Sequence, residues 1–277
     1  MSMNPERRDW RPWLKANHGL RMDANSDAWA PDRRELHLSR YRFAAQRCAG
    51  QDVLDAACGT GYGSRLLAGQ AASVVGVDIS DDAVEYARAV YASPNTRYVQ
   101  APVECTPLAN AAFSTIVSFE TLEHTLAPVA TLREFARLLR ADGQLIVSTP
   151  NGWGYTKDHF FDIDQELFEA LLGASFDRWE LYFNNSGSRR GYSRQAGIGP
   201  LAALREGRAE CLIAVCSGPL PAGDDDSRHT QWMLEVYRNA MWRHRQFQKA
   251  EKRFRSWPLN LLARHWGWQG RTPEARG

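Results

Sequence analysis

One short segment, residues 53–68, constrains the fold of this chain more than any other. An apolar run ends in Asp55, passes through three alternating glycines and continues into a helical pattern at 64–69. This order is typical of the first strand, turn and helix of a nucleotide-binding βαβ unit. The segment therefore predicts an α/β fold whose first turn lets the backbone approach a ligand closely.

The spacing of the glycines indicates which ligand the turn accepts. Gly59, Gly61 and Gly63 alternate, whereas the dinucleotide fingerprint places its third glycine three residues after the second. This difference disfavours a pyrophosphate. Asp78 ends the next apolar run, where an acid can accept hydrogen bonds from both hydroxyls of a ribose. The pattern favours a nucleoside without a diphosphate.

Strand-like and helical runs alternate through the rest of the chain. Strands are predicted at 53–57, 74–78, 97–100, 115–119, 144–149, 178–183 and 211–216, and helices at 64–69, 81–92, 128–139 and 164–173. Such alternation predicts right-handed βαβ units. We expect an α/β, Rossmann-like, doubly wound and mostly parallel seven-stranded sheet, with an N-terminal helical arm and a C-terminal helical extension. Residues 184–210, rich in Gly, Ser and Arg, are expected to form a functional loop.

Composition divides the chain into three parts. Residues 1–34 are a polar, proline-punctuated arm, and residues 35–223 hold the α/β pattern. Residues 224–277 form a basic extension, because eleven Lys and Arg stand against three Asp and Glu from residue 228 onward. We expect a helix in this extension that reaches roughly Phe254 and packs on the domain or on a second subunit, with residues 228–257 as a possible homo-oligomer contact. Membrane-surface contact by this extension is a weaker alternative, and nucleic-acid binding is not expected.

Cysteine usage and hydropathy indicate the compartment. The five cysteines are odd in number and form no C-x-x-C pair. The chain opens on no signal-peptide pattern, and no apolar run approaches the ~20 residues that span a bilayer. We therefore expect a cytoplasmic protein with reduced thiols.

These motifs resemble those of the class I S-adenosylmethionine-dependent methyltransferases. The first motif of that family has the form acid-x-x-x-Gly-x-Gly-x-Gly, which Asp55 and the three glycines match, and its second is the ribose-binding acid, which Asp78 matches. The resemblance continues through residues 119–124 and 138–151, and it covers about residues 35 to 216. Residues 35–223 would thus be a class I methyltransferase domain.

The resemblance implies S-adenosyl-L-methionine as the cofactor. The residues that would bind it are Asp55, Gly59, Gly61, Gly63, Asp78, Ile79, Val103, Phe119 and Glu120. Asp55 would orient the amino group of the methionyl end, and Ile79 would lie against adenine. Where the family often has an acid for the adenine amine, this chain has Pro102, so the backbone around Val103 would read the base. Ser114 likewise replaces a frequent aspartate.

Residues beyond the fourth and fifth strands are the candidates for chemistry. His124 and His159 are the candidate general bases, because histidine has an unperturbed pKa of ~6.5. Trp153, Tyr155 and Asp162 would contact the acceptor. A purely structural role of each histidine remains the alternative, since methyl transfer can rest on proximity and orientation.

A metal ion is the next question that these residues raise. Glu120, Glu123 and His124 could ligate Mg²⁺, and some quinone O-methyltransferases of this fold use an acid and a histidine in this region. However, no pair of aspartates with octahedral oxygen character stands out. We expect no metal.

The order of a strand, Thr149-Pro150-Asn151, a loop, a histidine and an acid resembles a bacterial subgroup often linked to glycan and small-molecule modification. The resemblance thus implies O-methylation of a small-molecule or glycan-linked hydroxyl. Thr-Pro-Asn is not the motif of enzymes that methylate exocyclic amines of bases, which disfavours that reaction on nucleic acid. The alternatives are a C- or N-methyltransferase, including one acting on RNA, and a non-catalytic cofactor-binding subunit that serves assembly.

Overall fold

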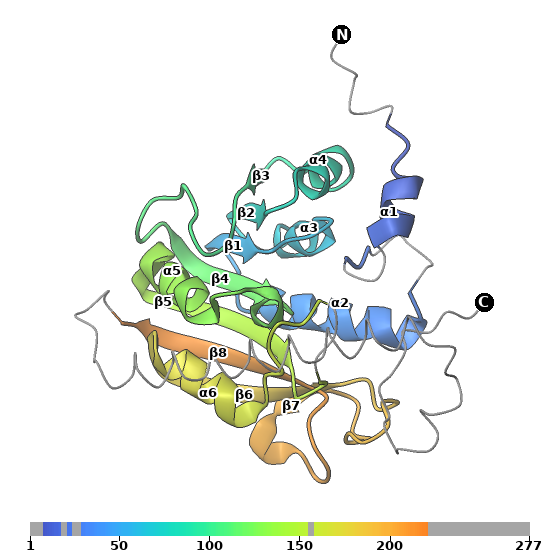
Figure 1. The fold of residues 1–277 in the computed structure, drawn as a ribbon. Coiled ribbons are helices and arrows are strands. Elements are labelled where there is room, and N and C mark those ends of the chain that lie inside the picture. Colours follow the sequence, from blue (N-terminus) through green and yellow to red (C-terminus); the bar gives the residue numbers. More distant parts are fainter. Residues whose placement is uncertain (1–7, 18–20, 24–28, 155–157, 221–277) are drawn as a thin grey trace.

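The computed structural model describes residues 8–17, 21–23, 29–154 and 158–220 (Figure 1). Its helices are α1 (Arg11–Asn17), α2 (Pro31–Ala45), α3 (Tyr62–Leu67), α4 (Asp81–Val90), α5 (Pro128–Leu138) and α6 (Gln165–Gly173), with short 3₁₀ turns η2 (Leu122–His124) and η3 (Leu201–Ala203). Its strands are β1 (Asp52–Ala56), β2 (Ser73–Asp78), β3 (Thr96–Gln100), β4 (Phe113–Phe119), β5 (Leu139–Pro150), β6 (Phe176–Asn185), β7 (Gly197–Pro200) and β8 (Cys211–Pro219). The C-terminal extension 224–277, with its expected helix and possible homo-oligomer contact, and Tyr155 lie outside the described residues.

The strands form one sheet in the order β3-β2-β1-β4-β5-β8-β6-β7. Strands β1 to β5 are parallel to their neighbours, whereas β8 runs antiparallel to both β5 and β6. The chain leaves β3 at one edge and returns on the far side of β1 as β4. The order therefore reverses between β1 and β4, and the crevice at the carboxyl ends of these two strands is where α/β sheets bind ligands.

The sheet has eight strands, so the prediction of seven was wrong by one. The additional strand, β7, lies inside the expected loop 184–210 and pairs antiparallel with the end of β6. Its sequence is Gly-Ile-Gly-Pro, which has neither the length nor the alternation of a recognisable strand. Pro200 and two glycines are tolerated because β7 is an edge strand, and Gly199 leaves room for the Phe183 ring, 2.8 Å from where a Cβ would stand.

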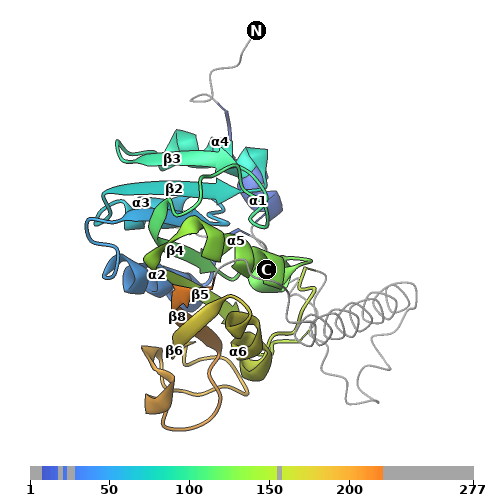
Figure 2. The ribbon, with the colours of Figure 1, turned by 90° about the vertical axis from the view of Figure 1, so that its left-hand side faces the viewer.

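Helices cover both faces of the sheet (Figures 1 and 2). On one face, α5 and α6 bury Phe135 and Phe168 against strand residues such as Leu54. On the other, α2 and α3 bury their apolar sides against strand residues such as Val53. Adjacent residues of β1 thus face opposite layers, as expected of a strand buried on both sides. This packing holds the β1 and β4 ends in fixed positions.

The described part of the N-terminal arm packs on the outer helix α4. The rings of Trp10 and Trp13 lie 5.3 and 5.4 Å from the ring of Tyr86. Arg8 adds exposed ion pairs with Asp82 and Glu85. Helix α2 begins at Pro31, because proline fits the first turn of a helix.

Two expectations about compartment have structural counterparts. All five cysteines are free, four of them buried. Among the described residues, no helix has the length and apolar character needed to cross a membrane.

Candidate functional site

The glycine-rich turn uses its three glycines in different ways. Gly59 and Gly61 have φ of 56° and 88°, in the left-handed region that disfavours a side chain. A Cβ on Gly61 would lie 2.6 Å from that of Ala87. Gly63 is instead inside α3, where a Cβ would run into the ring of Tyr41. Its role in the structure is therefore to let α2 and α3 pack closely.

The carboxylate of Asp78 binds the turn and the N-terminal arm at once. Its Oδ2 accepts a hydrogen bond from the Gly59 N–H at 3.0 Å, and its Oδ1 accepts one from the Ser80 N–H at 2.9 Å. Nη2 of Arg21 donates to Oδ1 at 3.1 Å. Next to this buried acid, Ile79 is 65% exposed. An acid with an exposed apolar neighbour is the arrangement predicted for a ribose and an adenine face.

Asp55 lies below the turn and is fully buried. Its two oxygens accept hydrogen bonds from the Tyr41 hydroxyl at 3.1 Å and from Ser64 Oγ at 2.6 Å. Burial raises the pKa of Asp55 to about 6, and the two hydrogen bonds oppose that shift. Asp55 thus ties α2 and α3 to the end of β1, and its contact with a cofactor amino group stays a prediction.

The remaining predicted cofactor residues lie at the same edge of the sheet. Val103 is buried in the core beside Ala101, just after β3. Phe119, the last residue of β4, packs edge-to-face on Tyr41 with ring centroids 5.0 Å apart. Glu120 follows it and has a φ of 52°, and Ala57 after β1 has a φ of 62°. Left-handed torsions in non-glycine residues are strained, and here they mark both strand ends that border the crevice.

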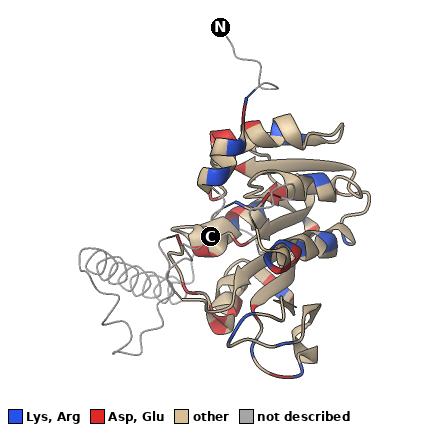
Figure 3. Ribbon diagram, turned by 90° about the vertical axis from the view of Figure 1, so that its right-hand side faces the viewer, with Lys and Arg blue, Asp and Glu red and all other residues tan. Residues whose placement is uncertain are grey.

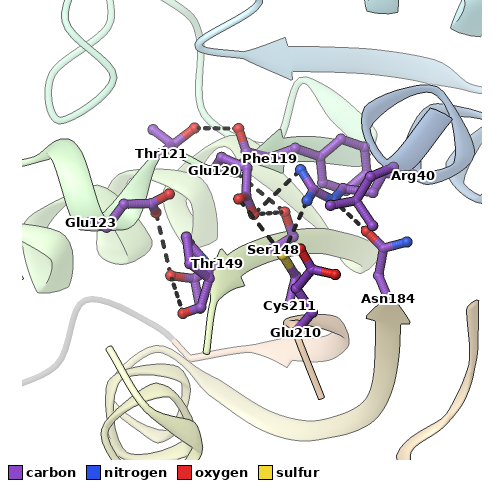
Figure 4. A network of polar contacts seen from close by, with 12 residues as sticks. Arg40, Phe119, Glu120, Thr121, Glu123, Ser148, Thr149, Asn184, Glu210 and Cys211 are labelled. Carbon is purple, nitrogen blue, oxygen red and sulfur yellow. Dashed lines mark hydrogen bonds and ion pairs between the residues drawn. The ribbon is translucent and has the colours of Figure 1, made fainter. Parts of the chain in front are cut away.

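Glu120 is held by a buried network that includes a guanidinium from α2 (Figure 4). Ser148 Oγ donates to Glu120 Oε1 at 2.9 Å, and Nη1 of Arg40 lies 3.4 Å from the same oxygen. Arg40 also donates from Nε to Asn184 Oδ1 at 2.7 Å and from Nη2 to Cys211 Sγ at 3.2 Å. This arginine is completely buried, so it connects α2, β4, β6 and β8 through polar contacts.

His124 and His159 come together although 34 residues separate them. Their ring centroids are 4.8 Å apart in an edge-to-face arrangement. His124 Nδ1 lies 2.8 Å from the carbonyl oxygen of Asp158, and since that oxygen can only accept, Nδ1 carries the proton and Nε2 of the neutral ring is an acceptor. Burial, followed by the nearby His124, lowers the pKa of His159 to about 4. His159 is therefore neutral at pH 7, as a base must be.

Glu123 is the third polar residue of this cluster, and it is buried. Its carbonyl accepts the N–H of Phe160 at 2.8 Å, which holds the segment of His159 against η2. Burial, followed by the Glu120 carboxylate, raises the pKa of Glu123 well above its ordinary value. Carboxylate and imidazole atoms of Glu123, His124 and His159 lie within 4.8 Å of one another, a donor set that suits several divalent metals. The expectation of no metal stays a prediction.

The predicted acceptor residues lie on the loop after β5. Trp153 donates from Nε1 to the Glu210 carbonyl at 2.8 Å. Asp162 accepts the Gly154 N–H at 2.8 Å, which joins the loop to the segment that carries His159. Trp153 and the two histidines therefore belong to one surface region at the carboxyl edge of the sheet.

Two arginines of this site were not predicted from the sequence. Arg40 lies four residues after Leu36 and four before Ala44, both of which are buried in α2. A charged residue on the apolar side of a helix is the one sequence feature that could have indicated its buried role. Arg21 lies in a polar segment with no periodicity, and its contact with Asp78 spans 57 residues. No local pattern indicates such a contact.

Comparison with known proteins places these features in a family. A family model described as a methyltransferase domain matches residues 54–147, a range that includes the turn, Asp78 and the end of β4. Residues 54–147 therefore belong to a methyltransferase domain. A protein from Pyrococcus horikoshii OT3 superposes with a TM-score of 0.55 at 17% identity, over 76% of this chain and 100% of that one. This likeness confirms the Rossmann-like fold of the methyltransferase domain.

Relatives of the methyltransferase domain match over part of their length. A probable S-adenosylmethionine-dependent methyltransferase of Mycobacterium tuberculosis is 41% identical over 115 residues, which are 42% of this chain and 41% of that protein. A ubiquinone biosynthesis O-methyltransferase of Vibrio campbellii is 32% identical over 119 residues, 42% of this chain and 51% of that protein. The chain thus spans about half or less of the relatives that it matches.

Proposed function

We propose that this protein is an S-adenosylmethionine-dependent methyltransferase that methylates a hydroxyl oxygen of a small-molecule or glycan-linked acceptor. The observation that carries the proposal is the pairing of the glycine-rich turn with Asp78 at the reversal point of the sheet. The name of the Mycobacterium tuberculosis relative supports the cofactor, and that of the Vibrio campbellii relative supports oxygen as the methylated atom.

The residues present fit this cofactor. A Cβ on Gly59 would meet only the side chain of Arg21, 4.0 Å away, within the described structure, so the outer side of the turn has room for a ligand. Asp78 offers carboxylate oxygens to ribose hydroxyls, and the exposed Ile79 offers an apolar surface to a base. Phe119 and Glu120 end the neighbouring strand and border the same crevice.

The chain's own residues have two tasks in the reaction. When bound, the sulfonium supplies an electrophilic methyl group. The protein must orient the acceptor oxygen in line with that methyl group and accept the hydroxyl proton. Nε2 of neutral His124 can accept a proton while Nδ1–H stays bonded to the Asp158 carbonyl. The His124 imidazole would then hold the hydroxyl proton, and the Nδ1–H bond to Asp158 would keep the ring oriented.

Replacing Asp78 by asparagine is expected to weaken binding of S-adenosylhomocysteine roughly 10- to 100-fold, since a charge-assisted hydrogen bond contributes about 1.5–3 kcal/mol. Isothermal titration calorimetry of the full-length protein measures this. Asp142→Asn is the matched control, because Asp142 is exposed at the start of β5. Unchanged affinity in a folded Asp78→Asn protein would contradict the ribose assignment.

Methyl transfer itself is tested with tritiated S-adenosylmethionine and a panel of hydroxylated acceptors that includes quinols and oligosaccharides. Label recovered as an ether on oxygen would support the proposal. Cofactor binding combined with label on carbon or nitrogen, or with no transfer to any acceptor, would favour the alternatives of a C- or N-methyltransferase or a non-catalytic subunit.

A further inference from the structure

The loop between β6 and β8 brings arginines to the acceptor side of the site. It holds Arg189, Arg190, Arg194, Arg205 and Arg208. Figure 3 draws the Lys and Arg positions of the ribbon in blue. Opposing them are Glu206 and Glu210, and Glu210 is buried with its carboxylate bonded to Ser186. The solvent-facing side of the loop is therefore strongly positive.

Three of the arginines near this site converge on two aromatic rings. The guanidinium carbon of Arg189 lies 3.6 Å from the ring centroid of Trp153, and that of Arg33, from α2, lies 5.1 Å from the same centroid. Arg189 and Arg208 lie 5.5 and 5.3 Å from the ring centroid of Tyr192. A guanidinium stacked on a ring keeps its N–H donors in its own plane, where they can bind a planar or tetrahedral anion.

Backbone groups of residues 151 and 152 fix the position of the Arg208 side chain. Its Nη2 donates to the Asn151 carbonyl, and Gly152, with φ of 59°, leaves the space that this guanidinium fills. The Tyr192 hydroxyl donates to the Gly152 carbonyl at 3.1 Å. Arg208 and Tyr192 are thus fixed against the loop after β5 before any ligand arrives.

A second link joins the two segments that carry Arg33 and Arg189. Ser188 Oγ donates to Asp32 Oδ2 at 2.8 Å, and this bond joins the start of α2 to the loop. Among the described residues, no carboxylate lies within ion-pair distance of the Arg33 or Arg208 guanidinium. These two positive charges are therefore not neutralised by a direct partner in this part of the chain.

The arginine and aromatic cluster adjoins the two histidines. Trp153 is followed by Gly154, whose N–H donates to Asp162, three residues after His159. The positive charge of Arg189 is also close enough to lower the pKa of His159, after the larger effects of burial and His124. A molecule bound at the cluster would therefore reach the candidate bases.

We propose that the methyl acceptor is a small molecule with an anionic group, a phosphate or a carboxylate, that binds to Arg33, Arg189 and Arg208 beside Trp153 and Tyr192. This inference rests on the proposed function, because it names the acceptor class of the same site. Fixed guanidinium groups lose little freedom on binding an anion, so they favour an acceptor that carries such a group over a neutral one.

Binding of inorganic pyrophosphate, phosphate and citrate to the full-length protein saturated with S-adenosylhomocysteine tests the proposal, with glucose as the neutral probe. Saturable binding of an anion is expected, and Arg33→Gln and Arg208→Gln should each weaken it by about fivefold or more. Arg205→Gln is the matched control, because Arg205 is exposed on the same loop and its guanidinium makes no hydrogen bond or ion pair among the described residues. Stronger binding of the phosphates or of citrate identifies which anion the cluster selects.

The outcomes separate this inference from the proposed function. Affinity for S-adenosylhomocysteine should be equal in all variants, which shows that they fold. If the cofactor product binds but no anion does, or if Arg205→Gln weakens the anion as much as Arg208→Gln, the anionic-acceptor inference is wrong while the proposed function stands. If a single-stranded RNA oligonucleotide binds more tightly than the small anions, and Arg33→Gln and Arg208→Gln weaken that binding, the acceptor is nucleic acid and the small-molecule inference is wrong. Failure of the wild-type protein to bind S-adenosylhomocysteine would count against the proposed function itself.

Discussion

The substitution His124→Ala is expected to lower turnover by roughly 10²–10⁴-fold, because a positioned general base contributes a factor of that size. The affinity for the cofactor should not change. The structure supports this role through the neutral Nε2 that the Nδ1–H bond to Asp158 leaves as an acceptor. Alanine at position 159 should have a comparable effect if His159 receives the proton directly. Initial rates with a fixed acceptor and calorimetry of S-adenosylhomocysteine are the two measurements.

The pH profile tests whether His159 is the base. The pKa of His159 is lowered to about 4, so a reaction that depends on its neutral form loses rate only as the pH falls through about 4. His124→Gln keeps a polar side chain of similar reach without a titrating nitrogen. Turnover within a few-fold of the wild type in both alanine variants would leave proximity and orientation as the source of catalysis, and it would eliminate the base assignment.

Replacing Arg40 by leucine is expected to lower the free energy of unfolding by about 3–5 kcal/mol, the cost of leaving one partner of a buried ion pair without the other. Glu120 would lose the cation at 3.4 Å, and Asn184 would lose its donor at 2.7 Å. Urea unfolding followed by circular dichroism measures the change as a shift in midpoint at constant slope.

Arg42→Leu is the control for this prediction. Arg42 is on the same helix and pairs with Glu35, but both side chains are more than half exposed, so the expected change is about 0–1 kcal/mol. Adding Glu120→Gln to Arg40→Leu removes the uncompensated carboxylate and should restore part of the loss. Equal midpoints for Arg40→Leu and Arg42→Leu would show that the Arg40 network does not stabilise the fold.

The order of elements was predictable from the sequence because the core strands are buried on both faces. Strand β2, for example, contains the apolar run Val74-Val75-Gly76-Val77, which is buried in the sheet, and such runs are recognisable without tertiary context. β7 was not predictable. Its four residues are held by backbone pairing with β6, and an edge strand that packs little side-chain surface leaves no hydrophobic pattern.

The candidate site likewise contains some residues that the sequence indicates and others that it does not. The glycines and Asp78 were found because one βαβ unit fixes their spacing, and the two histidines because both follow strands that end at the same edge. The roles of the buried arginine and of the arginine cluster come from contacts between segments far apart in the chain. Arg40, for example, bonds to Asn184, 144 residues away. Neither propensity nor spacing encodes such pairs, since they form only when the sheet brings its edges together.

If Asp78 binds the ribose as proposed, its contact with Arg21 makes the N-terminal arm a competitor of that ligand. A carboxylate offers about four lone-pair positions, and the Gly59 and Ser80 N–H groups and Arg21 already use three on Asp78. Two ribose hydroxyls require two positions, so Arg21 must release its oxygen before both can bind.

The apparent dissociation constant is then the intrinsic one divided by the fraction of molecules in which Arg21 is released. Arg21→Ala should therefore bind S-adenosylhomocysteine more tightly than the wild type, whereas Arg11→Ala, which removes an exposed pair with Asp9, should not. Weaker binding by Arg21→Ala would instead make Arg21 a part of the cofactor's own binding surface. If Arg21→Ala does bind more tightly, the strength of the Arg21–Asp78 ion pair sets the cofactor concentration at which half of the protein molecules have cofactor bound.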